Sequence, residues 1–531
     1  KERFLSSKSK KEKEHVTTLI STSKKYKKYG LKLEENYSKL RLTVDTKYDL
    51  YVINKLLKYF NYNIHIDLDK IIKLYKKKKD FFERNSNQKR NINMDLNLGQ
   101  KFWIRANEII PGGTMLFSKN PDLLLPLKWP AYFSKSKGYN VWDLENNKYS
   151  DMFSMGIGTN SLGYCRKEID NQVIKTLNKG NMTSLNSTEE IILAEKLISL
   201  HPWADMVRFT RSGGEANSVA IRIARASTQK DNVAVCGYHG WHDWYLSSNL
   251  NNSKNLNLHL MKNLPIDGVA KNLKNTTFPF EYNNFNQLEN LVNKKNIGII
   301  KMEVRRFEPP KNNFLKKVRN LANKKKIILI FDECTSGFRE AYGGLHIKYN
   351  ISPDIAIFGK ALGNGYAINA IIGKKDVMEA CKSTFISSTF WTERIGSTAA
   401  IKTLEIMKKL KSWEYIPKIG KYIKQKWASL SKAESVPIKI DGLNALPIFN
   451  FETKKNDHLT YKTYLTQEML KKNILASNVI YISVAHDKKM IDKYFLSLEK
   501  IFKKIKQCEN ENLDINALLE TRKCISGMRD K

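Results

Sequence analysis

The chain has 531 residues, of which 41% are hydrophobic, and it carries a formal net charge of +38. This length and apolar content suffice for a globular protein of two or three domains, and no apolar stretch approaches the ~20 residues that cross a bilayer. The basic residues are spread over the whole length, and no nucleic-acid motif with interleaved aromatic residues appears, so we expect neither a nucleic acid nor a membrane as a partner.

The first part of the chain, residues 1–80, is basic and starts at a lysine with no apolar leader, which suggests that it begins inside a larger protein. His15-Val16-Thr17 and the run from Leu40 to Leu50 resemble the C-terminal end of the cytidylyltransferases that activate acidic or surface sugars. The resemblance places Asp45 near a nucleotide-bound metal. Because the glycine-rich nucleotide loop is absent, we expect a remnant that cannot transfer a nucleotide by itself, with a helical basic appendage as the alternative.

A linker is predicted at residues 81–96, where charged and Asn-rich sequence lacks apolar periodicity. After it we expect an N-terminal arm over residues 97–155, a large domain over 156–402 and a smaller α+β domain over 403–531. Strand-like apolar runs alternate with helical patterns in the large domain, which predicts an α/β fold with a mostly parallel central sheet flanked by helices. The apolar runs are Met206–Thr210, Val233–Cys236, Ile327–Phe331 and Ile355–Gly359.

A glycine-rich segment, Arg211 to Ala216, comes directly after the first of these runs. Glycines let backbone amides approach an anion closely, and helical spacing after this segment places Ser212, Gly213 and Gly214 at a helix N-terminus, where the dipole favours phosphate. Taken alone, the segment is as readily a flexible turn. Its interpretation therefore depends on the side chains at the ends of the other strands.

Chemically useful side chains come after each of the other three runs. Tyr238 and His239 come after the second run, Asp332 after the third and Lys360 after the fourth. In an open α/β sheet the ligand sits beyond the carboxyl ends of the parallel strands, so these side chains should meet. A lysine amine can form a Schiff base with an aldehyde, and a carboxylate can hold a pyridine nitrogen protonated. With the phosphate cradle, these residues predict a site for pyridoxal phosphate (PLP).

The same segments, in the same order, resemble the class III aminotransferases, which are fold type I PLP enzymes. The resemblance runs from Gln100 to about Lys506, and it is closest to glutamate-1-semialdehyde aminomutase and to related enzymes of surface-polysaccharide gene clusters. It is carried by Ile110-Pro111-Gly112-Gly113, Val141-Trp142-Asp143, Tyr149-Ser150-Asp151, Arg211 to Ala216, Asp332 to Arg339 and Phe358 to Gly365.

The resemblance implies two catalytic residues and makes residues 156–402 the PLP-binding domain. Lys360 is implied to be the Schiff-base lysine, which then serves as general base and acid, and Asp332 is implied to be the partner of the pyridine nitrogen. Tyr238 is the implied stacking ring. The full set of implied cofactor contacts is Ser212, Gly213, Gly214, Tyr238, His239, Asp332, Lys360 and Thr389. Thr389 falls where the family reaches across a dimer to the partner's phosphate, so we expect a homodimer.

Two departures from the aminomutase pattern affect the expected substrate. Lys119 stands where that enzyme has an arginine for its substrate, and a lysine offers a point charge in place of a bidentate fork. Cys334 stands where the family has a valine. These changes favour an aminotransferase that uses an amino donor and a keto or aldehyde acceptor in surface-polysaccharide precursor synthesis. Glutamate-1-semialdehyde 2,1-aminomutase and a catalytically silent scaffold of the same fold remain as alternatives.

We interpret the other reactive side chains as structural. His239 and His242 lack a third ligand at metal-binding spacing, so no metal site is expected. Glu333 and Arg339 are predicted to form ion pairs or helix caps. The six cysteines are scattered without Cys-x-x-Cys spacing, which predicts free thiols and a cytoplasmic protein.

Overall fold

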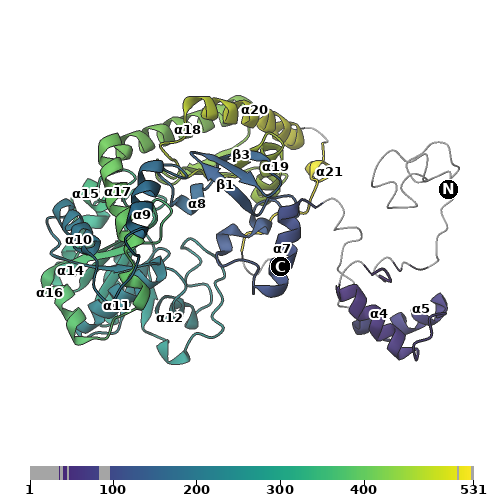
Figure 1. The fold of residues 1–531 in the computed structure, drawn as a ribbon, viewed down its shortest axis with the longest axis horizontal. Coiled ribbons are helices and arrows are strands. Elements are labelled where there is room, and N and C mark those ends of the chain that lie inside the picture. Colours follow the sequence, from purple (N-terminus) through teal and green to yellow (C-terminus); the bar gives the residue numbers. More distant parts are fainter. Residues whose placement is uncertain are drawn as a thin grey trace. The chain divides into compact units, whose positions relative to one another are not determined.

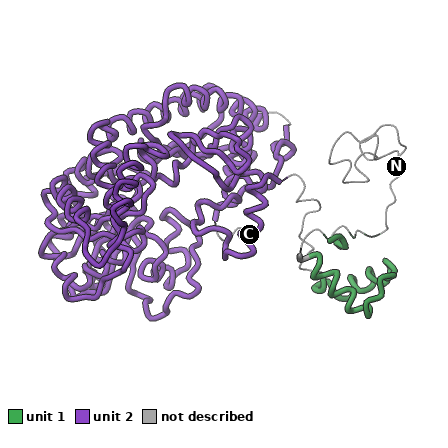
Figure 2. The backbone as a smooth tube through the Cα atoms, in the orientation of Figure 1, with its two compact units in different colours: residues 1–95 green, residues 96–531 purple. Residues whose placement is uncertain are grey.

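The computed structural model describes residues 35, 37, 40–44, 47–82, 96–510 and 513–527. The chain divides into two compact units, Lys1–Asp95 and Leu96–Lys531 (Figure 2). The segment His15-Val16-Thr17, Asp45 and most of the linker predicted at 81–96 lie outside the described residues.

The described residues of the first unit form the helices α4 (Lys47–Tyr59) and α5 (Leu68–Lys77) and the short 3₁₀ turn η1 (Lys79–Phe82). Asp67 caps α5 by accepting a hydrogen bond from the Asp69 N–H. Each helix buries an apolar stripe, which joins Phe81 and Phe82 in a small core of its own. The described part of this unit therefore packs around a local apolar cluster.

The second unit is built around a seven-stranded sheet with the strand order β4-β10-β9-β8-β7-β5-β6. β10 is antiparallel to both of its neighbours, whereas the pairs from β9 to β6 are parallel. The strands are β4 (Met206–Thr210), β5 (Val233–Cys236), β6 (Thr277–Pro279), β7 (Ile299–Glu303), β8 (Ile328–Glu333), β9 (Ile355–Phe358) and β10 (Asn369–Gly373).

Both faces of this sheet are covered, because alternate residues of its strands enter different cores. On β9, Ile355 and Ile357 pack with α11 (Gly213–Thr228), whereas Ala356 and Phe358 join a core on the opposite face. Three helices that pack together supply that second core, as Figure 1 shows: α9 (Lys167–Leu177), α10 (Thr188–Leu200) and α17 (Arg394–Leu410). The apolar runs of the sequence are continuous because both of their faces are buried.

Two smaller sheets complete the second unit. The first has the strand order β1-β2-β3-β13 and consists of β1 (Phe133–Lys137), β2 (Asn140–Asp143), β3 (Lys148–Met152) and β13 (Ile474–Ala476). The second pairs β11 (Ile438–Asp441) with β12 (Ile448–Phe451). The long helices α18 (Ser412–Glu434) and α20 (Lys488–Asn510) run along the same side of this part (Figure 1), and they bury apolar residues in a core shared with β7 and β8. α19 (His458–Leu470) packs beside α20.

The remaining helices are short or lie at the margins: α7 (Leu98–Ile109), α8 (Met155–Gly158), α12 (Asp243–Leu246), α13 (Phe285–Lys294), α14 (Phe314–Lys324), α15 (Leu345–Lys348), α16 (Lys375–Met378) and α21 (Ile515–Leu518). Within the described ranges, none of the helices combines the length and the hydropathy that a membrane span requires.

Candidate functional site

The N-terminus of α11 has the form expected of an anion site. Ser212 is the N-cap, and it forms a capping box with Glu215, whose carboxylate accepts the Ser212 N–H at 2.8 Å. The N–H groups of Gly213 and Gly214 belong to the first helical turn, where no intrahelical acceptor exists. A Cβ at Gly214 would lie 2.8 Å from His242 Nε2, so a larger residue does not fit there. The segment is a helix start, and the alternative of a flexible turn is ruled out.

Asp332 is the penultimate residue of β8, which corrects the expectation that it follows the strand. Its side chain is 4% exposed, and its Oδ2 accepts a hydrogen bond from His239 Nδ1 at 2.8 Å. Lys301 Nζ lies 3.9 Å from the same oxygen. Burial opposes ionisation of Asp332, but Lys301 and His239 outweigh it and hold the pKa of this carboxyl below its ordinary value. Asp332 is thus a buried carboxylate.

Cys334 connects Asp332 with the start of α11. Its N–H donates to Asp332 Oδ1 at 3.0 Å, and its Sγ accepts from Asn369 Nδ2 at 3.4 Å. A Cβ built on Gly213 would lie 3.6 Å from that sulfur. The glycine turn, the carboxylate and the small thiol therefore meet beyond the carboxyl ends of the strands, where an α/β sheet binds its ligands.

Lys360 comes shortly after β9, next to β8, and lies in the 3₁₀ turn Lys360–Gly363. Its φ of +43° is in the left-handed region, which a residue with a Cβ adopts only when its surroundings hold it there. Nζ donates to Thr335 Oγ1 at 2.9 Å. Burial, with the nearby Arg306 and Arg339 acting in the same direction, lowers the pKa of Lys360 below its ordinary value. A neutral amine is the nucleophilic form of lysine, so this environment favours reaction with a carbonyl.

Thr335 also accepts a hydrogen bond from Arg306 Nη2, at 3.1 Å. The same guanidinium pairs with Glu303, with Nε 2.9 Å and Nη2 2.6 Å from the carboxylate. Glu303 in turn accepts the Tyr238 N–H at 3.2 Å. One hydrogen-bonded chain therefore connects the Lys360 amine with the aromatic residue predicted to stack on the ring.

Glu333, the residue after Asp332, is fully buried, and its carboxylate points away from Lys360 into a separate network. It accepts the His346 Nδ1–H at 2.6 Å and the Leu345 N–H at 2.7 Å, together with the Ser336 hydroxyl at 2.8 Å. Arg339 is 1% exposed and donates to the backbone carbonyls of Thr335 and Gly158. Both residues are held by structural contacts.

The structure places His239 behind Asp332, where it is fully buried. His242 instead approaches the Ser218 hydroxyl, with Nδ1 at 2.7 Å. In the described ranges no group of three or more His, Cys, Asp or Glu residues is arranged to hold a metal ion. Thr389 is exposed in the 3₁₀ turn η8 (Thr389–Thr392), which is fastened to Arg211 through the carbonyl of Trp391 at 2.8 Å.

Several residues of this site were not singled out from the sequence: Lys301, Glu303, Arg306 and Thr335. One signal was available, because Lys301 interrupts the apolar run of β7, and a charged residue inside such a run needs a buried partner. Thr335 and Arg306 carry no comparable local signal, since their positions depend on how distant loops meet.

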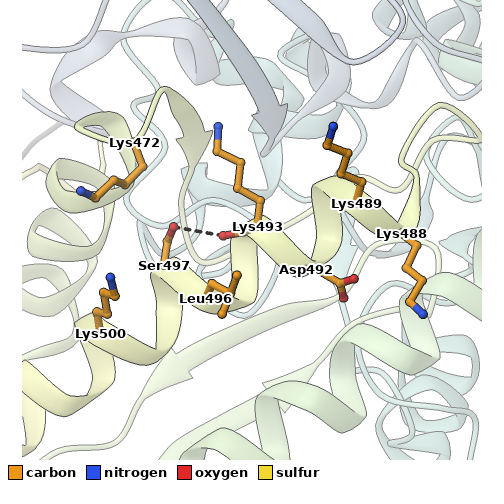
Figure 3. Close-up of a pocket in the computed structure, with 8 residues that line it drawn as sticks. All are labelled: Lys472, Lys488, Lys489, Asp492, Lys493, Leu496, Ser497 and Lys500. Atoms are coloured by element: carbon orange, nitrogen blue, oxygen red, sulfur yellow. Dashed lines mark hydrogen bonds between the residues drawn. The ribbon is translucent and has the colours of Figure 1, made fainter.

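A surface hollow lies elsewhere, along α20, and it is lined mainly by lysines (Figure 3). The ammonium groups of Lys489 and Lys493 point to one side of the helix, whereas that of Lys488 points to the other (Figure 3). Because these groups do not converge on a common point, the hollow lacks the arrangement that the sheet edge provides.

Solved structures share this fold. The chain superposes on the FumI protein of Sphingopyxis sp. MTA144, described as its PLP internal aldimine form, with a TM-score of 0.69 and 22% identity over 79% of this chain and 99% of that one. An omega-transaminase from Sphaerobacter thermophilus matches with a TM-score of 0.68 and 19% identity over 78% of this chain and 99% of that one. The predicted fold class, that of the fold type I transaminases, is confirmed.

The chain belongs to the class III aminotransferase family, whose model matches residues 127–492. It is 33% identical over 372 residues to 3-aminobutyryl-CoA aminotransferase of Cloacimonas acidaminovorans, covering 68% of this chain and 85% of the relative. It is 31% identical over 436 residues to glutamate-1-semialdehyde 2,1-aminomutase of Nitrosopumilus maritimus, covering 76% and 99%. Enzymes of this family use PLP, so the predicted enzyme class and cofactor are confirmed at the level of the family.

Proposed function

We propose that this protein is a PLP-dependent aminotransferase in which Lys360 and Asp332 are the catalytic residues. The observation that carries the proposal is the meeting of three groups at one sheet edge. The helix start at Gly213 lies next to Cys334, Cys334 donates to Asp332, and Thr335 accepts from the half-buried Lys360 amine. An anion site, a buried carboxylate and a lysine amine are the contacts that PLP requires.

The residues present fit the cofactor. The amides of Gly213 and Gly214 and the hydroxyl of Ser212 would hold the phosphate, because they form the first turn of a sixteen-residue helix. Asp332 would hold the ring nitrogen. Tyr238 is half-buried beside Glu303 and is available to the ring face, whereas His239 contacts Asp332 and would orient it.

When bound, PLP supplies an aldehyde that combines with primary amines and a protonated ring that accepts the electron pair left by a broken C–H bond. Lys360 then holds or moves the proton, since its Nζ has a lowered pKa and is kept in place by Thr335. Asp332 stays ionised and so keeps the ring nitrogen protonated.

The substrate proposal starts from Lys119. Lys119 ends the 3₁₀ turn η2 (Phe117–Lys119) and is exposed, so a single ammonium is offered to an anionic substrate at that position. We propose a keto or aldehyde acceptor of surface-polysaccharide synthesis, with an amino acid as donor. Glutamate-1-semialdehyde aminomutation is the second candidate, supported by the relative in Nitrosopumilus maritimus, 99% of whose length is matched.

Further parts of the proposal come from the sequence resemblance. The first unit is proposed to be a remnant of a cytidylyltransferase, and Thr389 is proposed to complete the phosphate site of a partner subunit in a homodimer. The exposure of Thr389 and of its neighbour Phe390 is compatible with such an interface. A cytoplasmic location is proposed from the cysteine pattern.

The test is cofactor binding and half-reactions with purified protein. PLP should give a visible absorption band, and borohydride should fix the pyridoxyl group on Lys360, as peptide mass mapping would show. The matched variant Lys360→Ala should give neither. A wild-type protein without a band would be a silent scaffold, which contradicts the proposal.

A second experiment identifies the substrates. Amino donors should convert the bound cofactor to its amine form, and keto and aldehyde acceptors should reverse the change. A protein that accepts glutamate semialdehyde and no sugar or amino-acid acceptor would be an aminomutase, which would refute the preferred reaction.

A further inference from the structure

Lys301 is a buried lysine that the proposed reaction does not use. It lies in the middle of β7 with 0% of its surface exposed, and in register with Ile330 of β8. Its Nζ has no hydrogen-bond partner among the described residues. Since an ammonium without a partner is costly to bury, a purely structural position would favour an apolar residue such as Ile299, which lies on the same face of β7.

The surroundings of Lys301 indicate what its charge serves. Asp332 Oδ2 lies 3.9 Å from Nζ, and the Trp244 ring centroid lies 6.0 Å away. Glu303, Cys334 and His239 are other titratable groups that interact with it, and burial lowers the pKa of Lys301 against the effect of Asp332. Its strongest partner is therefore the carboxylate of the proposed cofactor site.

His239 and Lys301 approach the same oxygen of Asp332, and they differ in charge. Burial lowers the pKa of His239, so at neutral pH it donates from Nδ1 as a neutral ring. Among the described residues, Lys301 is then the one lysine or arginine whose side-chain nitrogen lies within 4 Å of the Asp332 carboxylate. Both contacts occupy Oδ2, whereas Oδ1 receives the Cys334 N–H and retains a free lone pair.

We propose that Lys301 is a positioning residue whose buried positive charge keeps Asp332 ionised and turned toward β7. This inference rests on the proposed function, because the carboxylate is then ready to accept the cofactor's ring N–H. Without Lys301, Asp332 keeps only neutral partners in contact, and burial then favours its protonated form. A protonated carboxyl presents a hydrogen where the ring nitrogen needs an acceptor.

The test uses Lys301→Met, which keeps the length and loses the charge, in the full chain. The variant should bind PLP more weakly than the wild type mainly at low pH, where Asp332 without Lys301 is protonated. The ratio of the variant's PLP dissociation constant to that of the wild type should therefore fall about tenfold or more between about pH 5.5 and about pH 8.5, because each pH unit below the pKa lowers the ionised fraction of Asp332 tenfold. Taking the ratio removes the titration of the PLP phosphate, which both proteins share. A merely structural role would weaken binding by the same factor at every pH.

A second measurement needs no cofactor. In urea unfolding of the ligand-free protein, Lys301→Met should lower the midpoint clearly in the wild-type background and much less in an Asp332→Asn background. Lys462→Met is the matched control, since this largely buried lysine donates to the Leu123 carbonyl, away from Asp332, and its effect should not depend on residue 332.

Equal effects of Lys301→Met on the midpoint in both backgrounds, or a ratio of dissociation constants that does not change with pH, would overturn the proposal. If the wild type binds no PLP, the proposed function fails, while coupling between residues 301 and 332 in the unfolding experiment still decides whether Lys301 sustains the charge of Asp332.

Discussion

Thr335 offers the sharpest test of how this site holds its lysine. Its hydroxyl accepts hydrogen bonds from Lys360 Nζ at 2.9 Å and from Arg306 Nη2 at 3.1 Å. Thr335→Val keeps the shape of the side chain and removes the acceptor. Arg306 retains Glu303, so the principal loss falls on the lysine.

The size of the effect can be worked out from the hydrogen bond. Leaving the Lys360 amine without its acceptor costs about 1–3 kcal/mol, and each 1.4 kcal/mol of transition-state stabilisation is about tenfold in rate. Thr335 contacts Lys360 while the amine is free, which is the form that moves a proton. We therefore expect the rate of the half-reaction to fall about tenfold to a hundredfold, with PLP retention little changed.

The assay is a single-turnover half-reaction with a saturating amino donor, monitored by the absorbance of the cofactor. Thr335→Ser is the matched control, because it keeps the hydroxyl and loses only a methyl group, and its rate should stay within about threefold of the wild type. A Thr335→Val rate equal to the wild type, or a serine variant as slow as the valine variant, would refute the assigned role.

Three further expectations rest on the same structure. Glu333→Gln should lower the free energy of unfolding by about 3 kcal/mol or more, because each carboxylate oxygen accepts two donors and one of these oxygens becomes an NH₂ group. Denaturant unfolding measures the change, and a loss below about 1 kcal/mol would contradict the network. The folded-state pKa of Glu333 is lowered, so its contribution to stability should be present above the unfolded pKa near 4.5 and should disappear as the pH falls. The difference in unfolding free energy between the wild type and Glu333→Gln should therefore shrink in acid. Ser212→Ala should lower the free energy of unfolding by about 1 kcal/mol through the lost N-cap, and it should also weaken PLP binding. Ser218→Ala, in the middle of α11, is the control for the effect on phosphate binding. If Ser212→Ala binds PLP as tightly as the wild type, Ser212 does not belong to the phosphate site. The folded-state pKa of Lys360 is lowered as well. The ligand-free wild type should therefore gain stability relative to Lys360→Met as the pH rises toward the ordinary lysine pKa of 10.5. A difference in unfolding free energy that does not change with pH would mean that the amine is not buried.

The continuous apolar runs at β8 and β9 were enough to predict strands buried on both faces, because neither run alternates with polar residues. The resemblance then assigned Asp332 and Lys360. The strand limits were less certain, and β8 extends through Asp332 to Glu333 because both residues pair with β9. That extension decides that the two neighbouring carboxylates point to opposite faces, one toward Lys301 and the other toward His346.

By itself the sequence determined the order of the strands along the chain, the glycine turn that opens α11 and the class of chemistry, since these depend on residues that are close together in the chain. Only the tertiary structure decided that Lys301 lies beneath Asp332 and that Thr335 receives the Lys360 amine together with Arg306. Such neighbours are set by the register between strands and by the meeting of loops from β7, β8 and β9, and no local pattern encodes a distance across a sheet.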